Sequence, residues 1–276
     1  MILFSKRGIL LLGFGLFFPG VPVFSADLAA HRAIYDLRLL SGGGGADFTD
    51  VTGKLYIDWN DVCDGWTLTQ HVRMVFSGRS GNALNNDFSF SSWESRDGNE
   101  FRYTMRSTTN DKLNEQVEGR AELDPGRVGG VARFSKPNDS SVPLPAGTLF
   151  PTEHLVLTLE HALAGGGVLT RNVFSGTGED SLNEVSAFIG PLIAASDAHE
   201  TLSKTNPSAA AALRDLRSWP VAMAYFPYGD GDYEPEFEVH FQVMENGVSP
   251  SMDFDYGSFA IRGVIEHLEY HPLPEC

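Results

Sequence analysis

Apolar and polar residues alternate in short segments along most of this chain. Every second side chain from Ala33 to Leu39 is apolar, and the same pattern runs from Phe237 to Val243. A period of two sends successive side chains to opposite faces of a strand, so each segment predicts a strand with one buried face. Turns such as RDGN and DPGR separate several of the segments. The sequence therefore predicts a mostly β protein built from many antiparallel strands.

Two segments depart from this alternation and predict helices. The segment TEHLVLTLEHAL places Leu155, Leu159, Ala162 and Leu163 on one apolar helical face. It follows Pro151 and ends shortly before Gly165. A weaker pattern, NPSAAAALRDL, begins with Asn206 as a candidate N-cap in front of Pro207. We expect one principal helix and a minor second one within the sheet protein.

The first residues have the composition of a secretory signal peptide. Lys6 and Arg7 precede the uncharged run GILLLGFGLFFPG, and small residues follow in VPVFSA. The run is short and contains Pro19, which disfavours the alternative of an uncleaved membrane anchor. We expect cleavage after Ser25, so that residues 26–276 form a single exported domain. No later segment offers the ~18 consecutive apolar residues that a spanning helix needs, so the mature protein is expected to be soluble.

The chain is strongly acidic. Its formal net charge is -16, and removal of Lys6 and Arg7 with the signal peptide changes this to -18. Such a surface repels nucleic acid and anionic lipid headgroups, which argues against both as electrostatic partners. The basic residues are scattered, so they do not predict a local binding patch.

Cys63 and Cys276 are the two cysteines of the sequence. In an oxidising compartment two cysteines usually pair, which favours an internal disulfide that attaches the end of the chain to its early part. An intermolecular disulfide and a lipid anchor are the alternatives. A lipoprotein would need a cysteine at the cleavage site, and none is there.

Catalytic and metal motifs give weak signals. The patterns G-x-S-x-G, S-x-x-K and H-E-x-x-H are absent. His154 and His161 lie two helical turns apart, about 10 Å, which is too far to share one zinc ion without other ligands. His71 and His240 complete the set of histidines that a hydrolase with dispersed residues would use. We expect no catalytic site, no metal site and no cofactor.

The stretch DGDYEPEFE could offer oxygen ligands to calcium. Its carboxylates alternate along an extended chain, at Asp230, Asp232, Glu234, Glu236 and Glu238. The EF-hand pattern is missing, because Glu234 and Pro235 stand where an Asp or Asn followed by Gly would be required. We interpret the stretch as a solvated strand face.

Aromatic residues are frequent and alternate within the predicted strands. The tryptophans are Trp59, Trp66, Trp93 and Trp219. Buried core is the usual place for such side chains. If the sheet curls without closing, the same side chains could instead line an apolar groove for a lipid tail or a peptide.

Several stretches also resemble the EipB family of cell envelope integrity proteins, formerly a domain of unknown function. They are HRAIYDLRL, VCDGWTL, SSWES, LPAGTLFPTEH, SWPVAMAYF, ENGVS, DYGSFAIRG and the terminal cysteine, in this order. The resemblance covers essentially the whole chain after the signal peptide. It implies a many-stranded antiparallel β-spiral, an incomplete barrel around a central helix, with a disulfide carried here by Cys63 and Cys276. No catalytic residue of this chain is inferred from the resemblance.

The resemblance also implies a periplasmic location in a Gram-negative bacterium and a role in keeping the envelope intact under stress. We therefore expect a non-catalytic, monomeric periplasmic protein that binds a lipid, a lipoprotein or a peptide of the envelope. One alternative is a carrier of lipoproteins or acyl chains in the periplasm. The other is an envelope hydrolase without a recognisable motif.

Overall fold

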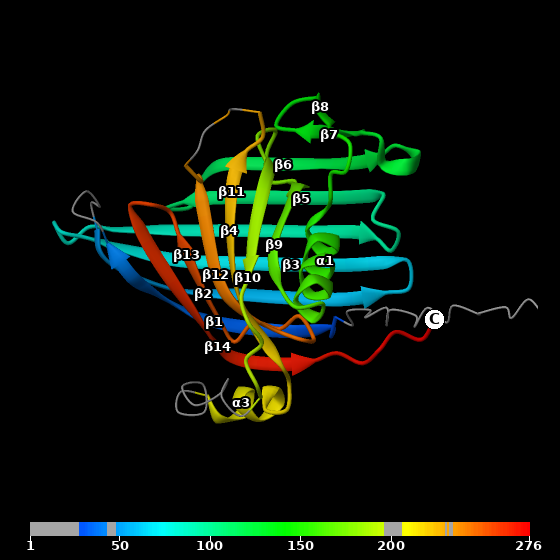
Figure 1. Ribbon diagram of the computed structural model, residues 1–276. Helices are drawn as coiled ribbons and strands as arrows, with labels where there is room; N and C mark the ends of the chain where they lie inside the picture. Colours follow the sequence, from blue (N-terminus) through cyan, green and yellow to red (C-terminus); the bar gives the residue numbers. More distant parts are fainter. Residues whose placement is uncertain (1–27, 43–47, 196–205, 230, 232–233) are drawn as a thin grey trace, which may run out of the picture.

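The computed structural model describes the chain except for residues 1–27, 43–47, 196–205, 230 and 232–233. The predicted signal peptide therefore lies outside the described residues, as do Asp230 and Asp232. The described part is dominated by one antiparallel sheet of 14 strands (Figure 1). This confirms the predicted mostly β class. No helix in the described ranges is long and apolar enough to cross a membrane.

The strands have the following bounds: β1 His31–Gly42, β2 Phe48–Val62, β3 Gly65–Gly78, β4 Ala83–Ser95, β5 Glu100–Thr109, β6 Lys112–Leu123, β7 Gly130–Lys136, β8 Ser140–Leu144, β9 Gly167–Phe174, β10 Leu182–Ile189, β11 Ser218–Pro227, β12 Phe237–Met244, β13 Ser251–Asp255 and β14 Phe259–Tyr270. A 3-10 turn, η1, spans Pro125–Arg127 between β6 and β7. Strand β8 contains Pro143, and its pattern was too short and irregular to predict.

The strand order is β8-β7-β6-β5-β4-β3-β2-β1-β14-β13-β12-β11-β10-β9. Strands β1 to β8 form a meander in which each strand pairs with the one before it, because short turns favour antiparallel neighbours. Strands β9 to β14 form a second meander. The pairing of β1 with β14, from His31 with Tyr270 to Gly42 with Phe259, joins the two. In Figure 1 strands β9 to β12 of the second meander cross in front of the first meander, whereas β14 runs alongside β1.

The two edge strands, β8 and β9, are neighbours in sequence but not hydrogen-bonded partners. Helix α1 (Pro151–Leu163) lies in the connection between them. Leu149, just before the helix, forms a parallel bridge with Val173 of β9. Its N–H donates to the Asn172 carbonyl at 2.8 Å, and its carbonyl accepts from the N–H of Phe174 at 3.0 Å. The sheet is thus an incomplete barrel, as predicted, and α1 packs against β9 and β10 beside its gap (Figure 1).

The helix ends follow the sequence signals. Helix α1 begins at Pro151, and its last turn is closed by Gly166, whose N–H donates to the His161 carbonyl at 2.9 Å. Helix α3 spans Pro207–Leu213, and the Asn206 side chain accepts the N–H of Ala209 at 3.1 Å. This is the predicted N-cap. Helix α3 packs against β14, and its Ala209, Ala210 and Leu213 belong to the same buried cluster as Tyr35 and Leu37 of β1.

The buried side chains form three clusters inside the curled sheet. Tyr35 and Leu37 belong to the cluster beside α3, Phe101 and Phe150 to the cluster beneath β8, and Leu159 of α1 to the third. Apart from Phe150, which directly precedes α1, these residues stand at the inward positions of alternating strands or on the inner side of α1, which is why the pattern predicts their burial.

The buried face of α1 differs in part from the predicted one. Leu159 and Ala162 are buried as expected, whereas Leu155 and Leu163 are only half-buried. The first turn instead buries polar side chains, among them Thr152 and His154. The tertiary structure explains this difference, because the first turn of α1 faces a buried carboxylate and an internal cavity rather than a continuous apolar surface.

Candidate functional site

A cavity of about 340 Å³ lies inside the incomplete barrel. Its walls come from the inner faces of β1, β2, β3, β9, β11, β12 and β13, from the first turns of α1 and from the segments 28–29 and 246–249. This volume lies at the lower end of the ~300–1,000 Å³ range of small-molecule pockets. The space suits one narrow ligand rather than several.

The wall is mainly apolar. It includes the side chains of Ile57, Trp59, Leu68, Met223, Val239 and Phe241. None of the described residues that line the cavity is Lys, Arg, Asp or Glu. The polar lining side chains include two histidines, His31 and His154. Such a site favours a hydrocarbon chain and gives no countercharge to a buried ion.

The segment that precedes β1 closes one part of this wall. Leu28 and Ala29 line the cavity, and the N–H of Ala29 donates to the Asn246 carbonyl at 3.0 Å. Gly247 has a φ of +85°, and a Cβ placed there would stand 2.6 Å from Cδ2 of Leu28. The positive φ of this turn therefore favours glycine, and a larger residue there would also displace the end of the Leu28 side chain.

A buried carboxylate holds the N-terminus of α1. Glu94, at the end of β4, is 1% exposed, and its two oxygens accept the N–H groups of Thr152 and Glu153 at 2.8 Å each. These are donors that a helix leaves unpaired in its first turn. Burial raises the pKa of Glu94 to about 7, although the hydrogen bonds from the helix oppose this shift.

Glu94 is not among the residues predicted from the sequence. Glu94 lies on the same face of the alternating strand as Phe88 and Phe90, which point inward. A charged side chain at an inward position is the sequence signal that could have indicated it. The partner of this carboxylate, the start of α1, is distant in sequence and could not be read from that pattern.

His154 extends from α1 into the cavity wall. It is 4% exposed, and its Nε2 has no hydrogen-bond partner among the described residues. Burial, with a smaller effect of the positive charge of Arg171, lowers the pKa of His154 to about 4. The imidazole is therefore neutral near pH 7 and presents one protonated and one unprotonated nitrogen.

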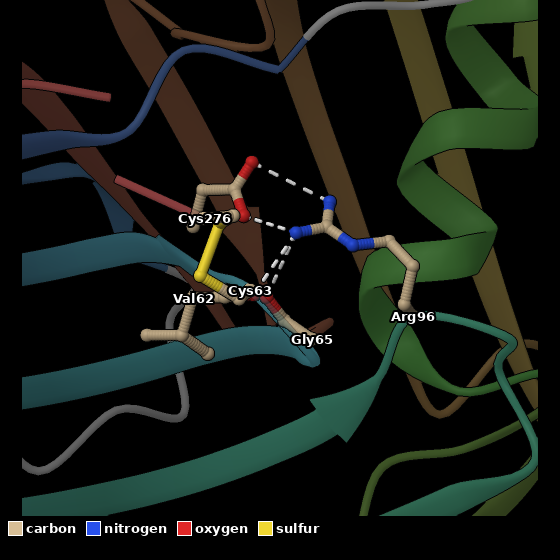
Figure 2. The surroundings of a disulfide bond; sticks show 6 residues. Val62, Cys63, Gly65, Arg96 and Cys276 are labelled. Atoms are coloured by element: carbon tan, nitrogen blue, oxygen red, sulfur yellow. Dashed lines mark hydrogen bonds and ion pairs between the residues drawn. A yellow bond between two sulfur atoms is a disulfide. The ribbon is translucent and has the colours of Figure 1, made fainter. Parts of the chain in front are cut away.

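Cys63 and Cys276 form a disulfide, the internal pairing predicted from the sequence (Figure 2). Cys63 lies in the turn between β2 and β3, and Cys276 ends the segment that follows β14. Their Cα atoms are 5.6 Å apart, within the ordinary range for a disulfide. The bond attaches the C-terminal segment across a sequence separation of 213 residues.

Asp58 of β2 holds the same C-terminal segment. The ring Nε2 of His271 lies 2.8 Å from its carboxylate, and Arg32 donates to it at 2.9 Å. Tyr56 and Asn60 also donate to this carboxylate. Burial alone would raise the pKa of Asp58, but these hydrogen bonds together hold it well below its usual range. The ionised carboxylate thus fixes the segment that leads to Cys276.

Arg96 fixes the turn that carries Cys63 (Figure 2). Its guanidinium forms an ion pair with Asp61, donates to the Val62 carbonyl at 3.0 Å, and lies 4.4 Å from the centre of the Trp66 ring. A planar guanidinium can make all of these contacts at once. Arg96 therefore stabilises the β2–β3 turn from the neighbouring β4–β5 turn.

The four candidate histidines are not brought together. His71 of β3 and His240 of β12 are exposed, His161 is half-buried, and His154 faces the cavity. Within the described ranges no hydrogen bond links any two of them, and no group of three His, Cys, Asp or Glu side chains could hold a metal ion. Of the carboxylates in the stretch DGDYEPEFE that the structure describes, Glu234 and Glu236 are exposed and Glu238 is half-buried.

The tryptophans divide between core and partly exposed positions. Trp219 is 3% exposed in the core, and Trp59 is 7% exposed and lines the cavity. Trp66 is half-buried and stacks on Trp59, with ring centres 6.4 Å apart. Trp93 is also half-buried, and the guanidinium of Arg102 lies over its ring. Trp59 therefore belongs to the core and to the wall of the cavity, two roles that the sequence analysis treated as alternatives.

Comparisons with known proteins give one consistent result. A family model described as EipB-like matches residues 24–272. The cell envelope integrity protein EipB of Brucella abortus (strain 2308) is 27% identical over 249 residues, which cover 88% of this chain and 85% of that protein. A crystal structure of a beta-barrel-like protein of the domain of unknown function DUF1849, also from Brucella abortus, superposes with a TM-score of 0.81. It is 25% identical and covers 90% of this chain and 100% of its own.

Proposed function

This chain belongs to the EipB-like family, and on that premise we propose that it supports cell envelope integrity in the periplasm by holding one apolar chain of an envelope lipid in its internal cavity. The proposal has three parts, which are the location, the ligand and the absence of catalysis. The similarity to a protein named for cell envelope integrity supports the general role. The cavity supports the ligand.

The observation that carries the proposal is the cavity wall without charged side chains. Hydrocarbon transferred from water into such a space gains about 0.8 kcal/mol for each buried CH₂ group. A peptide of similar size would bring backbone N–H and C=O groups that need partners. The surface of the wall is mainly apolar, although it includes polar side chains such as Gln70, Ser175 and Asn246. A lipid chain therefore fits this cavity better than a peptide does.

Two observations support a periplasmic location. The first residues have the composition of a signal peptide, and a structural disulfide such as that between Cys63 and Cys276 is typical of an oxidising compartment. Alkaline phosphatase fused to residues 1–40 should be exported and active. The same fusion should lose activity when Lys6 and Arg7 are both replaced by Glu, because the positive start of the signal is then reversed. An inactive wild-type fusion would contradict this location.

The absence of catalysis is supported by the separation of the four candidate histidines. A general base must lie within hydrogen-bond reach of a nucleophile or an orienting group. His154 has no such partner on Nε2 in the described part of the chain. Turnover of an envelope lipid that is abolished by His154→Ala would contradict this part of the proposal.

The ligand is tested by native mass spectrometry of the mature protein, purified without detergent from its own periplasm. We expect an added mass that matches a lipid with an acyl chain. Val239→Phe, which adds volume inside the cavity, should reduce the retained fraction. Glu238→Phe is the matched control, because it places the same side chain on the opposite face of β12.

Three results would change the conclusion. A retained peptide would replace the lipid as ligand. A bare mass, together with no binding of added acyl chains by the folded protein, would contradict binding in the cavity altogether. Transfer of the retained lipid to acceptor vesicles would identify a carrier, the alternative for which the same cavity would serve.

A further inference from the structure

One polar group in the apolar wall of the cavity has no partner in the protein. Nε2 of His154 is buried and accepts or donates no hydrogen bond within the described chain. The residue itself is 4% exposed and lines the cavity. A buried polar atom of this kind costs about 1–3 kcal/mol unless it is paired. A ligand in the cavity that carries a hydrogen-bonding group would recover this cost.

The charges around the cavity determine whether a charged or an uncharged group of a ligand can hydrogen-bond to His154. A carboxylate or a phosphate needs a countercharge or several donors when it leaves water. Among the described lining residues there is no Lys or Arg. Burial lowers the pKa of His31 as well as that of His154, so both imidazoles face the cavity in the neutral form near pH 7.

The N-terminus of α1 could attract an anion, because its first N–H groups are unpaired within the helix. Thr152 and Pro151 of this turn line the cavity. However, Glu94 already accepts the N–H groups of Thr152 and Glu153 at 2.8 Å each. The protein's own carboxylate thus occupies the anion site, and its negative charge would repel a second one.

We propose that the cavity selects a chain attached through an uncharged polar group, such as an ester, an amide or an alcohol, which hydrogen-bonds to Nε2 of His154, and that it discriminates against a free fatty acid of the same length. This inference rests on the proposed function, since it needs a hydrocarbon chain in the cavity. It adds the chemical class of the ligand and the residue that recognises it.

The test compares dodecanol, laurate and dodecane as competitors of a fluorescent acyl-chain probe on the full mature protein at pH 7.5. The wild-type protein should bind dodecanol about tenfold or more tightly than laurate, because laurate must bury a charge without a partner. It should bind dodecanol about fivefold more tightly than dodecane, the fold-change expected for one hydrogen bond.

The variant His154→Phe keeps a ring of similar shape but has no nitrogen. It should bind dodecane as the wild type does and lose the preference for dodecanol over dodecane. His154→Gln, which retains a hydrogen-bonding group, should keep part of that preference. His161→Phe is the matched control on the same helix, outside the cavity wall, and should bind all three competitors as the wild type does.

The outcomes separate the two proposals. Equal binding of laurate and dodecanol overturns the discrimination against a charged group, and an unchanged preference for dodecanol over dodecane in His154→Phe overturns the role of His154. A chain-binding cavity stands in both cases. If His154→Phe does not fold, an unchanged preference for dodecanol in a folded His154→Leu, which also lacks a hydrogen-bonding group, overturns that role too. Failure of all three competitors and of the probe to bind the folded wild-type protein overturns chain binding itself.

Discussion

Glu94 and Thr152 are joined across a sequence separation of 58 residues, because Oε2 of the carboxylate accepts the backbone N–H of Thr152 at 2.8 Å. This contact links the end of β4 to the first turn of α1. It makes the helix at the gap of the barrel dependent on one buried acidic side chain.

Glu94→Gln should change the pH dependence of stability. The pKa of Glu94 is raised to about 7 from 4.5, so its contribution to stability is fully present below pH 4.5 and is lost as the pH rises through 7. Between pH 5 and 8 the wild type should lose about 2–3 kcal/mol of unfolding free energy from this group, and Glu94→Gln should not. Urea denaturation at the two pH values measures the difference. A wild type that gains stability relative to Glu94→Gln over this interval would show that the helix end outweighs burial.

His154 should change the pH dependence of stability in the direction opposite to that of Glu94. Its pKa is lowered to about 4 from 6.5, so its contribution is present above pH 6.5 and is lost as the pH falls through 4. At pH 5 the wild type should have lost about 2 kcal/mol from this group relative to pH 7.5. His154→Phe should be free of this loss in urea denaturation at the same two pH values. An equal loss in both proteins would contradict the assignment to His154.

Removal of the disulfide should destabilise the protein without preventing export. The chain-entropy model assigns about 5 kcal/mol to a loop of this length as an upper figure. Cys63→Ser combined with Cys276→Ser should lower the melting temperature, and reductant should lower that of the wild type in the same way. The serine variant should not respond to reductant. Equal melting temperatures of oxidised and reduced wild type would contradict a stabilising role of the bond.

Arg96→Lys should loosen the turn that carries Cys63. Lysine keeps the charge but loses the planar group that contacts Trp66, Asp61 and the Val62 carbonyl together. We expect a loss of about 1–2 kcal/mol and faster reduction of the disulfide by dithiothreitol.

Arg102→Lys is the matched control for this variant. Its guanidinium lies 4.8 Å from the centre of the Trp93 ring but makes no hydrogen bond to the β2–β3 turn. It should therefore leave the rate of reduction unchanged. Equal rates in Arg96→Lys and the wild type would show that Arg96 does not protect the bond.

Asn206 should contribute both to α3 and to its attachment. Its Oδ1 accepts the N–H of Ala209 at 3.1 Å, and its Nδ2 donates to the Ile265 carbonyl of β14 at 3.3 Å. Asn206→Ala removes both contacts and should cost about 1–2 kcal/mol in thermal or urea unfolding. Asn206→Asp keeps the acceptor but not the donor, so it should show an intermediate loss. Equal stability of the two variants would assign the whole effect to the attachment.

The sequence by itself determined the local structure of this protein. Alternation from Ala33 to Leu39 and from Phe237 to Val243 specifies strands and their inward faces, because a strand sends neighbouring side chains to opposite sides. Pro151 and Asn206 specify where the two helices begin, because both residues suit the unpaired first turn of a helix. With two cysteines in an exported chain, the pairing of Cys63 and Cys276 could also be predicted.

Only the tertiary structure decided how these elements enclose a cavity. The alternating pattern predicts that Trp59 and Val239 face inward. It does not predict whether side chains from the opposite wall fill the space in front of these two residues. That depends on the curvature of the whole sheet and on the position of α1 at its gap. The pairing of Glu94 with the start of α1 and the unpaired Nε2 of His154 arise in the same way, since burial and hydrogen bonding depend on partners distant in sequence.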